Sequence, residues 1–285
     1  MSRHDFDQEP DDLRNAEERH SEREEREPRD QEVTRSREVR PRYRDIEHAA
    51  QLAESQLRTL IEIGTFRAVN FDDLVRYRYQ GDEGLARREL NDLARVGLVR
   101  RQTTTRTGAE QYSLTRSGYG AVENRRDKDS EQVLYHGFVK PKEADHDAAI
   151  YRLYERAAKD ITESGGRVTR VVLDFELKRS INRQLAKTSG MSPDEQARRK
   201  QEIAEEHGLK VINGRIAIPD LRLEYETADR EQNKIDLELV TGHYRGHSLS
   251  EKAQAGFRMF ASEADRAHLR AAMTDPEIMQ EILSL

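Results

Sequence analysis

The period of the apolar residues changes from helical to alternating within residues 93–118, LARVGLVRRQTTTRTGAEQYSLTRSG. Apolar residues before Gly97 recur every three or four positions, whereas those after it alternate with polar ones, as in a β-strand. Gly97 is suited to end the helix, and Thr107-Gly108 is suited to form the turn of a β-hairpin. The stretch therefore predicts a helix, a two-stranded hairpin and a second helix that begins after Thr115.

Two further helices are expected upstream of this stretch. The first carries one apolar face and ends near Gly64, and Asn70 caps the second. The helix that ends at Gly97 is then the third. Three helices followed by a two-stranded hairpin is the plan of a winged helix-turn-helix, and residues 93–118 resemble bacterial winged-helix DNA-binding proteins. We therefore place a winged helix-turn-helix over residues 48–125.

The third predicted helix presents polar side chains away from its apolar face. Arginine and asparagine have the hydrogen-bonding groups that match base edges in the major groove of DNA. The candidate base-reading residues are Arg88, Asn91 and Arg95. The hairpin adds candidate residues for a phosphate or a minor groove, namely Arg100, Arg101 and Arg106. Glu89 and Asp92 lie beside the helical set, so the alternative that this module binds a protein stays open.

The first 45 residues differ in composition from the rest of the chain. They hold 11 arginines and 15 acidic residues, a net charge of −4, and hardly any apolar side chains. Too little apolar surface is present to offset the entropy of ordering the backbone, so residues 1–45 are expected to be a disordered charged arm. The alternative is a tail that folds onto a partner or onto DNA phosphates. Its arginines would be Arg35, Arg37, Arg40, Arg42 and Arg44.

Composition excludes several classes of protein. Beyond the arm, the 285-residue chain has a net charge of only −2, so any binding of nucleic acid depends on a local basic surface. The absence of cysteine excludes disulfides, thiolate zinc sites and cysteine nucleophiles. No apolar stretch is long enough to cross a membrane, and the start lacks the apolar core of a signal peptide. We therefore expect a cytoplasmic protein with no membrane partner.

The C-terminal half shows a different order of elements. Residues 126–144 are expected to form a linker and residues 145–285 a mixed α/β layer, which makes the whole chain α+β. Helices are expected at 145–163, 176–188, 193–206 and 249–262. Strands are expected at 168–175, 211–218, 221–225 and 235–241. The tail 269–285 is expected either to pack on this domain or to form a homodimer contact.

Acidic residues lie on two of the predicted strands. Asp220 directly precedes one strand, and Asp236 and Glu238 lie on the next, where alternation puts both side chains on one face. Carboxylates within a stretch rich in Ile, Leu and Val are costly unless they are solvated or bind a cation. Asp220 together with that pair would suit Mg²⁺. The alternative is a set of hydrogen-bonded acids with no common ion.

Three separate pieces of sequence carry a resemblance, Ile218-Pro-Asp220, Ile235-Asp-Leu-Glu238-Leu and Lys252. Together they resemble the PD-(D/E)xK nuclease superfamily. With the upstream winged helix, they are similar to the replication-relaxation family of plasmids and integrative elements. The resemblance implies that Asp220 and Glu238 bind a divalent metal, with Asp236 as a third ligand. It also implies that a lysine positions or activates the attacking water. The position two after Glu238 is Val240 and not lysine, so Lys252 on the next helix is expected to take that role.

Two classes of function follow from these patterns. The first is a DNA-binding protein of a mobile element or plasmid with a role in replication or DNA processing. Its winged helix would bind double-stranded DNA, and its C-terminal domain would be a Mg²⁺-dependent endodeoxyribonuclease or would keep that fold without cleavage. The second is a transcriptional regulator or antitoxin-like repressor whose inactive C-terminal domain mediates protein contacts. DNA cleavage in the presence of Mg²⁺ distinguishes a working nuclease from the hypotheses in which the C-terminal domain does not cleave DNA.

Overall fold

The computed structural model describes residues 52–104, 108–137, 141–242, 244, 246–272, 279 and 282–285. The side chains of residues 141–144 and 272 are not described. By its internal contacts the chain divides into two units, Met1–Val39 and Arg40–Leu285, and every described residue belongs to the second. The predicted arm of residues 1–45 lies outside the described residues. The described part is mixed α+β, as the sequence predicts.

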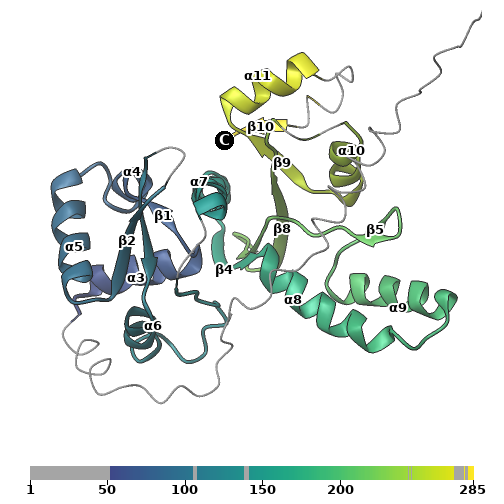
Figure 1. Ribbon diagram of the computed structural model, residues 1–285, viewed down its shortest axis with the longest axis horizontal. Coiled ribbons are helices and arrows are strands. Elements are labelled where there is room, and N and C mark those ends of the chain that lie inside the picture. Colours follow the sequence, from purple (N-terminus) through teal and green to yellow (C-terminus); the bar gives the residue numbers. More distant parts are fainter. Residues whose placement is uncertain are drawn as a thin grey trace, which may run out of the picture. The chain divides into compact units, whose positions relative to one another are not determined.

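The elements before residue 138, here called the N-terminal group, form a small sheet and the helices around it (Figure 1). In chain order they are α3 (Glu54–Thr65), β1 (Val69–Asn70), α4 (Phe71–Asp73), the π-helix η1 (Leu74–Arg78), α5 (Glu83–Arg95), β2 (Val99–Thr103), β3 (Glu110–Leu114) and α6 (Arg116–Glu123). Strand β3 lies between β1 and β2 and is antiparallel to both. The predicted hairpin is therefore present, and β1 adds a short third strand that the sequence pattern did not indicate.

Local signals in the sequence account for the ends of these helices. Gly97, which follows the C-cap residue Val96 of α5, has a φ of 76°, a left-handed conformation that favours glycine. The Leu98 amide donates to the Leu93 carbonyl at 2.9 Å, which closes the end of that helix. At the start of α6, the Thr115 hydroxyl accepts a hydrogen bond from the Gly118 amide at 3.0 Å. The predictions that Gly97 ends one helix and Thr115 caps the next are both confirmed.

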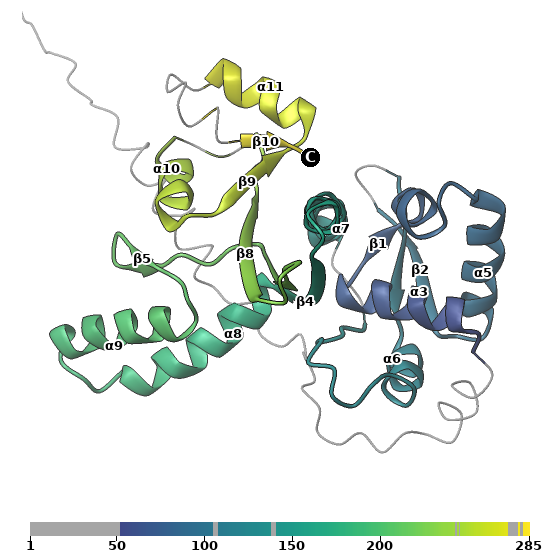
Figure 2. The same cartoon turned by 180° about the vertical axis from the view of Figure 1, so that it is seen from behind.

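The elements from residue 141 onward, here called the C-terminal group, form a larger mixed sheet with helices. They are α7 (Pro141–Glu163), β4 (Arg167–Leu173), α8 (Asp174–Leu185), the 3₁₀-helix η2 (Ala186–Thr188), α9 (Pro193–Glu206), β5 (Val211–Ile212), β6 (Arg215–Ile216), β7 (Leu221–Glu226), β8 (Gln232–Leu239), α10 (Gly246–Ala255), β9 (Arg258–Ala261), α11 (Glu263–Ala272) and β10 (Ile282–Ser284). Helices α8 and α9 lie side by side in both views (Figures 1 and 2).

The five strands of the larger sheet follow the order β10-β9-β8-β7-β4. Strands β4, β7 and β8 form an antiparallel meander, and the helical hairpin α8–α9 is inserted between β4 and β7. Strand β9 returns parallel to β8 through the crossover helix α10, and β10 adds parallel to β9. The central strands β7 and β8 are buried toward one end, and that end carries the acidic residues singled out in the sequence.

Three predictions for this group are wrong in detail. The helix expected at 249–262 ends at Ala255, and β9 follows it, because Gly256 has a φ of 88° and terminates the helix. Residues 211–218, expected to form one strand, instead contain a hairpin of two short strands, β5 and β6. Asn213 and Gly214 form its turn in left-handed conformations. Helix α7 also begins before residue 145, inside the stretch expected to be a linker.

One apolar core cluster includes residues of both groups. It runs from Leu60 of α3 through Tyr151 and Leu153 of α7 to Leu223 of β7 and Phe260 of β9. Helix α7 packs against β1 and α4 on one side and against β4, β7 and β8 on the other. The two groups therefore share a helix and a core.

The outer edge of the sheet at β4 is covered by a side chain. Gln132 donates from Nε2 to the Val171 carbonyl at 3.0 Å and accepts from the Val171 amide at 2.8 Å. One amide side chain thus takes the place that a neighbouring strand would fill at this position.

Each described helix is either too short or too polar to cross a lipid bilayer.

Candidate functional site

The register of β7 and β8 brings Asp220 and Glu238 together. Leu221 is paired with Leu237, so the residue before Leu221 lies opposite Glu238. The Asp220 amide donates to Glu238 Oε2 at 3.3 Å, and Asp220 Oδ2 accepts from the Leu239 amide at 3.0 Å. The two carboxyl groups are therefore fixed side by side by the backbone of two paired strands.

Glu238 is the most buried acid of this site. Its side chain is 1% exposed, and Lys252 Nζ of α10 lies 2.6 Å from its Oε1. The Tyr244 hydroxyl donates to the same oxygen at 2.8 Å, and Lys252 also donates to the Ile218 carbonyl at 3.1 Å. The sequence-predicted set of Asp220, Glu238 and Lys252 thus lies in one place, with the lysine supplied from the helix after β8.

Burial and like charge shift the titration of both acids. Desolvation, and then the neighbouring Asp220 charge, raise the pKa of Glu238 to about 7, although Lys252 and Tyr244 oppose the shift. Desolvation also raises the pKa of Asp220, against the opposing effect of His146. The site therefore disfavours two negative charges and gains from any cation that stabilises both.

Asp236 does not join this pair. It lies opposite Arg222 in the strand register, and both of its oxygens accept from that guanidinium, at 2.6 and 2.8 Å. Arg222 is buried and also donates to the His207 carbonyl at 2.6 Å. The bidentate pair occupies the carboxylate and corrects the expectation that Asp236 is available as a third metal ligand. The alternation of side chains along the strand predicted that Asp236 lies on the same face as Glu238, but it could not reveal that Arg222 is its partner.

Three polar residues near the site were not singled out as functional from the sequence. His146 of α7 places Nε2 at 3.9 Å from Asp220 Oδ1, and a hydrogen bond to Asp147 raises its pKa against desolvation. Tyr244 contacts Glu238, as described above. Lys178 of α8 lies 2.9 Å from Asp174, the first residue of that helix. These residues come from helices and a loop far apart in sequence, so spacing gave no signal for them.

The residues present fit a two-carboxylate magnesium site. Mg²⁺ usually keeps several waters and uses one or two protein carboxylates. Among the described residues, no group of three His, Asp or Glu side chains is arranged to bind a metal. Asp220 and Glu238 would hold the ion. Because Lys252 and Tyr244 occupy Glu238 Oε1, metal binding requires that oxygen to share or exchange its partners.

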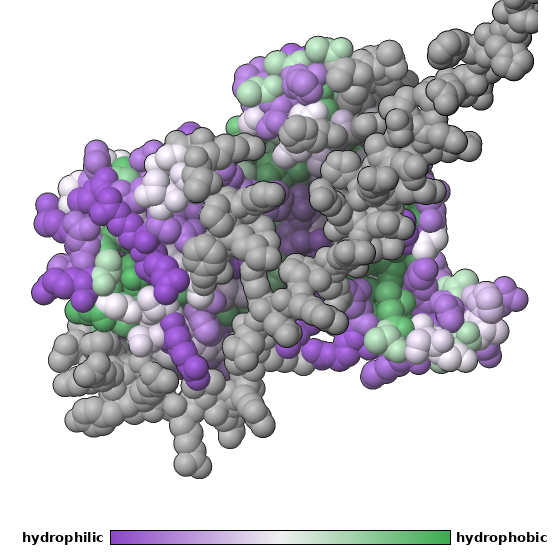
Figure 3. All heavy atoms as spheres, viewed as in Figure 1, coloured by the Kyte–Doolittle hydropathy of each residue, from purple (hydrophilic) through white to green (hydrophobic). Residues whose placement is uncertain are grey.

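A second candidate site is the exposed face of α5. Arg88, Asn91 and Arg95 are all exposed, on the side of the helix opposite the buried Leu90 and Leu93. In Figure 3, hydrophilic residues gather over the region where Figure 1 shows α5.

Ion pairs distinguish the members of this face. Arg95, 76% exposed, pairs with Asp92 at 2.8 Å, whereas the exposed Arg88 makes no ion pair with a described residue and Asn91 is uncharged. The placement suits a surface that contacts a partner.

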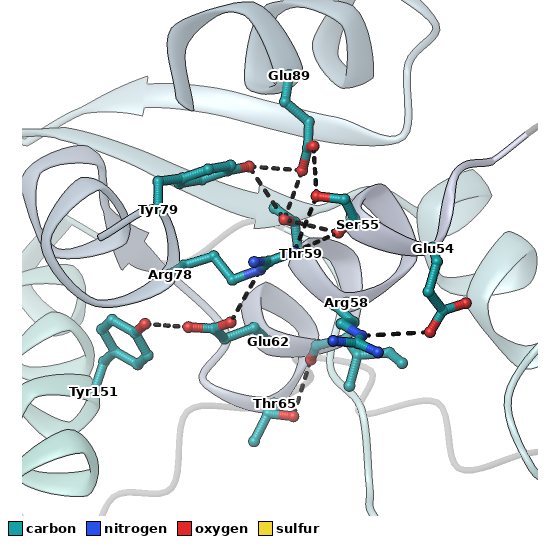
Figure 4. A network of polar contacts seen from close by, with 11 residues as sticks. Glu54, Ser55, Arg58, Thr59, Glu62, Thr65, Arg78, Tyr79, Glu89 and Tyr151 are labelled. Carbon is teal, nitrogen blue, oxygen red and sulfur yellow. Dashed lines mark hydrogen bonds and ion pairs between the residues drawn. The ribbon is translucent and has the colours of Figure 1, made fainter. Parts of the chain in front are cut away.

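Glu89 turns away from this face and into the protein (Figure 4). Its Oε1 accepts from the hydroxyls of Thr59 and Tyr79, each at 2.7 Å, and its Oε2 accepts from Ser55 at 2.9 Å. The negative charge therefore does not lie among Arg88 and its neighbours. It ties α5 to α3 and to the residue that follows η1.

The hairpin places its candidate arginines differently. Arg100 is exposed, and Arg101, also exposed, pairs with Glu110 at 2.9 Å. Arg87 of α5 makes a second pair with Glu110 at 2.8 Å and stacks over the Phe71 ring. Arg106 lies outside the described residues. The hairpin is thus fixed to α5 through one shared carboxylate.

Comparison of the chain with protein-family models, with curated proteins and with solved structures finds no match in any of the three. The function of the protein is therefore inferred from its sequence pattern and its geometry.

Proposed function

We propose that this protein binds double-stranded DNA through a winged helix-turn-helix and carries a Mg²⁺-dependent endonuclease site in its C-terminal sheet. The observation that carries the proposal is the trio of Asp220, Glu238 and Lys252. The two acids are adjacent across paired strands, and the lysine is 2.6 Å from one of them. The resemblance to the replication-relaxation family extends the proposal to a role in replication or DNA processing on a mobile element or plasmid.

The arrangement of the N-terminal group supports the DNA-binding half of the proposal. Its three helical segments, short strand and β-hairpin follow the order of a winged helix-turn-helix. In that plan α5 is the recognition helix, and its exposed Arg88 and Asn91 carry the groups that match guanine and adenine edges. Of the two acids that favoured a protein-binding module in the sequence, Glu89 is directed inward, and Asp92 stays on the exposed face, paired with Arg95.

The topology of the C-terminal group supports the nuclease half. The antiparallel meander β4-β7-β8 leads through the crossover helix α10 to the parallel strand β9. Asp220 directly precedes β7, and Glu238 lies in the neighbouring strand β8. Lys252 lies on the following helix and reaches back to Glu238.

The roles of the three residues follow from their contacts. Asp220 and Glu238 would hold a divalent cation, which when bound lowers the pKa of water and stabilises charge on a phosphoryl oxygen. Lys252 holds the Glu238 carboxylate in place through its short contact and lies close enough to donate to a water beside it. The raised pKa of Glu238 means that a cation and a proton compete for this site.

A second function is favoured by one specific observation. Lys252 already neutralises Glu238 directly, and among the described residues no third acid completes a metal-binding group. Such an internally paired site fits a catalytically inactive domain. The protein would then be a transcriptional regulator or antitoxin-like repressor whose C-terminal group mediates protein contacts.

The two functions are separated by metal titration and cleavage assays on matched variants. Calorimetry with Mg²⁺ or Mn²⁺ should show binding to the parent protein that Asp220→Asn abolishes. The control Asp229→Asn, in the exposed β7–β8 turn, should leave it intact. Lys252→Ala should retain metal binding but lose cleavage of supercoiled DNA. DNA binding without metal binding or cleavage supports the second function instead.

The DNA-binding half has its own test. Arg88→Ala should weaken binding of a preferred duplex by about 1–3 kcal/mol, the usual effect of losing a bidentate base contact. Arg156→Ala, an exposed arginine on α7 that pairs with Asp160, is the control. If the two variants bind DNA equally well, α5 is not the recognition helix.

A further inference from the structure

The exposed face of α8 carries a stripe of basic residues. Leu177 and Ile181 form the buried face of this helix, against Ile203 and Ala204 of α9. The residues on the opposite side, four positions apart, are Arg179, Arg183 and Lys187, the last in η2, and all three are exposed. Asn182 and Ala186 complete this face, which has no carboxylate over those turns. We call Arg179, Arg183 and Lys187 the α8 stripe.

The neighbouring helix has the opposite charge. The exposed residues of α9 include Asp194, Glu195, Glu202 and Glu205, with Arg198 as the basic exception on its outward side. Arg199 of α9 is paired with Glu202 at 2.8 Å. Arg183 and Lys187 make no ion pair or hydrogen bond with any described residue. The hairpin therefore presents one positive and one negative side, and the charges of Arg183 and Lys187 are not neutralised by any described residue.

Helix α8, which carries the stripe, starts next to the carboxylate site. Asp174, the first residue of α8, donates from its amide to the Asp220 carbonyl at 3.1 Å. Lys178 pairs with Asp174 at 2.9 Å, and the charges of Asp174, Asp220 and Glu238 raise its pKa against desolvation. Helix α8 thus runs outward from Asp220. A polyanion that lies along the stripe would reach the acid pair at the first turn.

We propose that the α8 stripe binds the phosphate backbone of DNA and guides one strand to the Asp220–Glu238 site. A spacing of four helical residues is about 6 Å along the axis, close to two nucleotide steps of about 3.4 Å in one strand of a duplex. The positive side of the hairpin then faces DNA, and the acidic side of α9 is directed away from it. This inference rests on the proposed function, because it supplies the substrate path to that site.

Charge reversal tests the stripe. Arg183→Glu/Lys187→Glu should weaken duplex binding by tenfold or more at moderate salt. The slope of log affinity against log salt should become shallower by about 2, since each phosphate contact contributes about 0.9. Arg198→Glu, which reverses an exposed arginine on the other helix of the same hairpin, is the control and should bind DNA as the parent does. The neutral variant Arg183→Gln/Lys187→Gln should show a smaller loss in the same direction.

A cross-linking experiment locates the contact directly. The chain has no cysteine, so Lys187→Cys and Arg198→Cys each create a single attachment site for a photoreactive group. Irradiation with labelled duplex should cross-link DNA to position 187 and not to position 198. A cross-link at 198 alone, or at neither position in a protein that binds DNA, overturns the proposal.

The outcomes separate this inference from the proposed function. One outcome contradicts only the proposal for the α8 stripe. In it, the parent binds DNA and Arg88→Ala weakens that binding, but the stripe variants change neither the affinity nor the salt slope. The proposal that the winged helix binds DNA is then retained. If the parent binds no duplex DNA, both proposals fail together. Circular dichroism and a urea midpoint equal to the parent's confirm that the exposed substitutions leave the fold intact.

Discussion

Glu238 places a carboxyl group in a nearly dry position beside a second acid. Its pKa of about 7 exceeds the value of 4.5 expected in an unfolded chain, so the folded protein holds a proton there that the unfolded chain releases. A group of this kind stabilises the fold below pH 4.5, and that stability is lost as the pH rises toward 7. Glu155 of α7, near Glu62, behaves alike, since burial and then the Glu62 charge raise its pKa to about 7.

This predicts a stability that falls between pH 5 and pH 7.5. Glu238→Gln keeps the volume of the side chain and removes its titration. The free energy of unfolding of that variant should depend less on pH, by on the order of 2–3 kcal/mol over this range. Urea titrations at pH 5, 6, 7 and 8 measure the effect. Glu155→Gln should flatten the profile as well. A Glu238→Gln profile parallel to the parent's would assign the pH dependence to other groups.

Glu89 and Arg88 are adjacent in sequence, but we expect only Glu89 to contribute to the stability of the fold. Glu89→Ala leaves the hydroxyls of Ser55, Thr59 and Tyr79 without their common acceptor, which should cost about 1–3 kcal/mol of stability. Arg88→Ala, on the exposed face, should change stability by less than about 0.5 kcal/mol. Chemical denaturation of both variants checks this. Equal stabilities would mean that the polar network of Glu89 does not anchor α5.

At the scale of elements, α6 depends on a close approach between two backbones. A Cβ atom added to Gly118 would lie 2.0 Å from the Leu98 carbonyl oxygen, whereas one added to Gly84 of α5 would meet only flexible side-chain atoms. Gly118→Ala forces α6 away from the start of β2.

The expected cost of Gly118→Ala is about 1–3 kcal/mol or more, as for other overpacked sites. Gly84→Ala should be neutral or stabilise the protein by up to about 1 kcal/mol, because alanine favours a helix. Thermal melts of the two variants measure both effects. Equal melting temperatures would show that α6 can shift without cost.

Elements with local signals were predictable from the sequence, and those fixed by distant partners were not. Gly97 and Thr115 mark their helix ends through their own backbone and hydroxyl chemistry. Strand β9 was missed because its apolar residues continue the helical pattern of α10, and only Gly256 and Phe257 separate the two elements. The pairing of Asp236 with Arg222 depends on the register between two strands, which alternation within one strand cannot supply.

At the scale of the whole molecule, α7 joins the two groups through its buried face. Tyr151 packs edge-on against Phe66 and Tyr77, and its hydroxyl donates to Glu62. On the same helix, Arg152 pairs with Asp73 at 2.9 Å. These contacts belong to the apolar core that both groups share.

We therefore expect the described part of the chain to unfold in one cooperative transition. Tyr151→Ala should destabilise it by about 3–5 kcal/mol, the usual effect of deleting a buried aromatic side chain. Far-ultraviolet circular dichroism and tyrosine fluorescence should report the same urea midpoint in the parent. Two separate transitions, with only one shifted by Tyr151→Ala, would show that the groups fold independently.

The contact of Gln132 with β4 bears on how this protein behaves in a crowded solution. An open strand at the border of a sheet is a template on which a second chain can add and start a fibrillar aggregate. The amide of Gln132 occupies both hydrogen-bonding groups of Val171 and blocks that template at its middle. Replacing Gln132 with alanine should leave the monomer folded but promote self-association at high concentration, visible as light scattering and thioflavin binding. We therefore expect Gln132 to protect this strand edge against self-association.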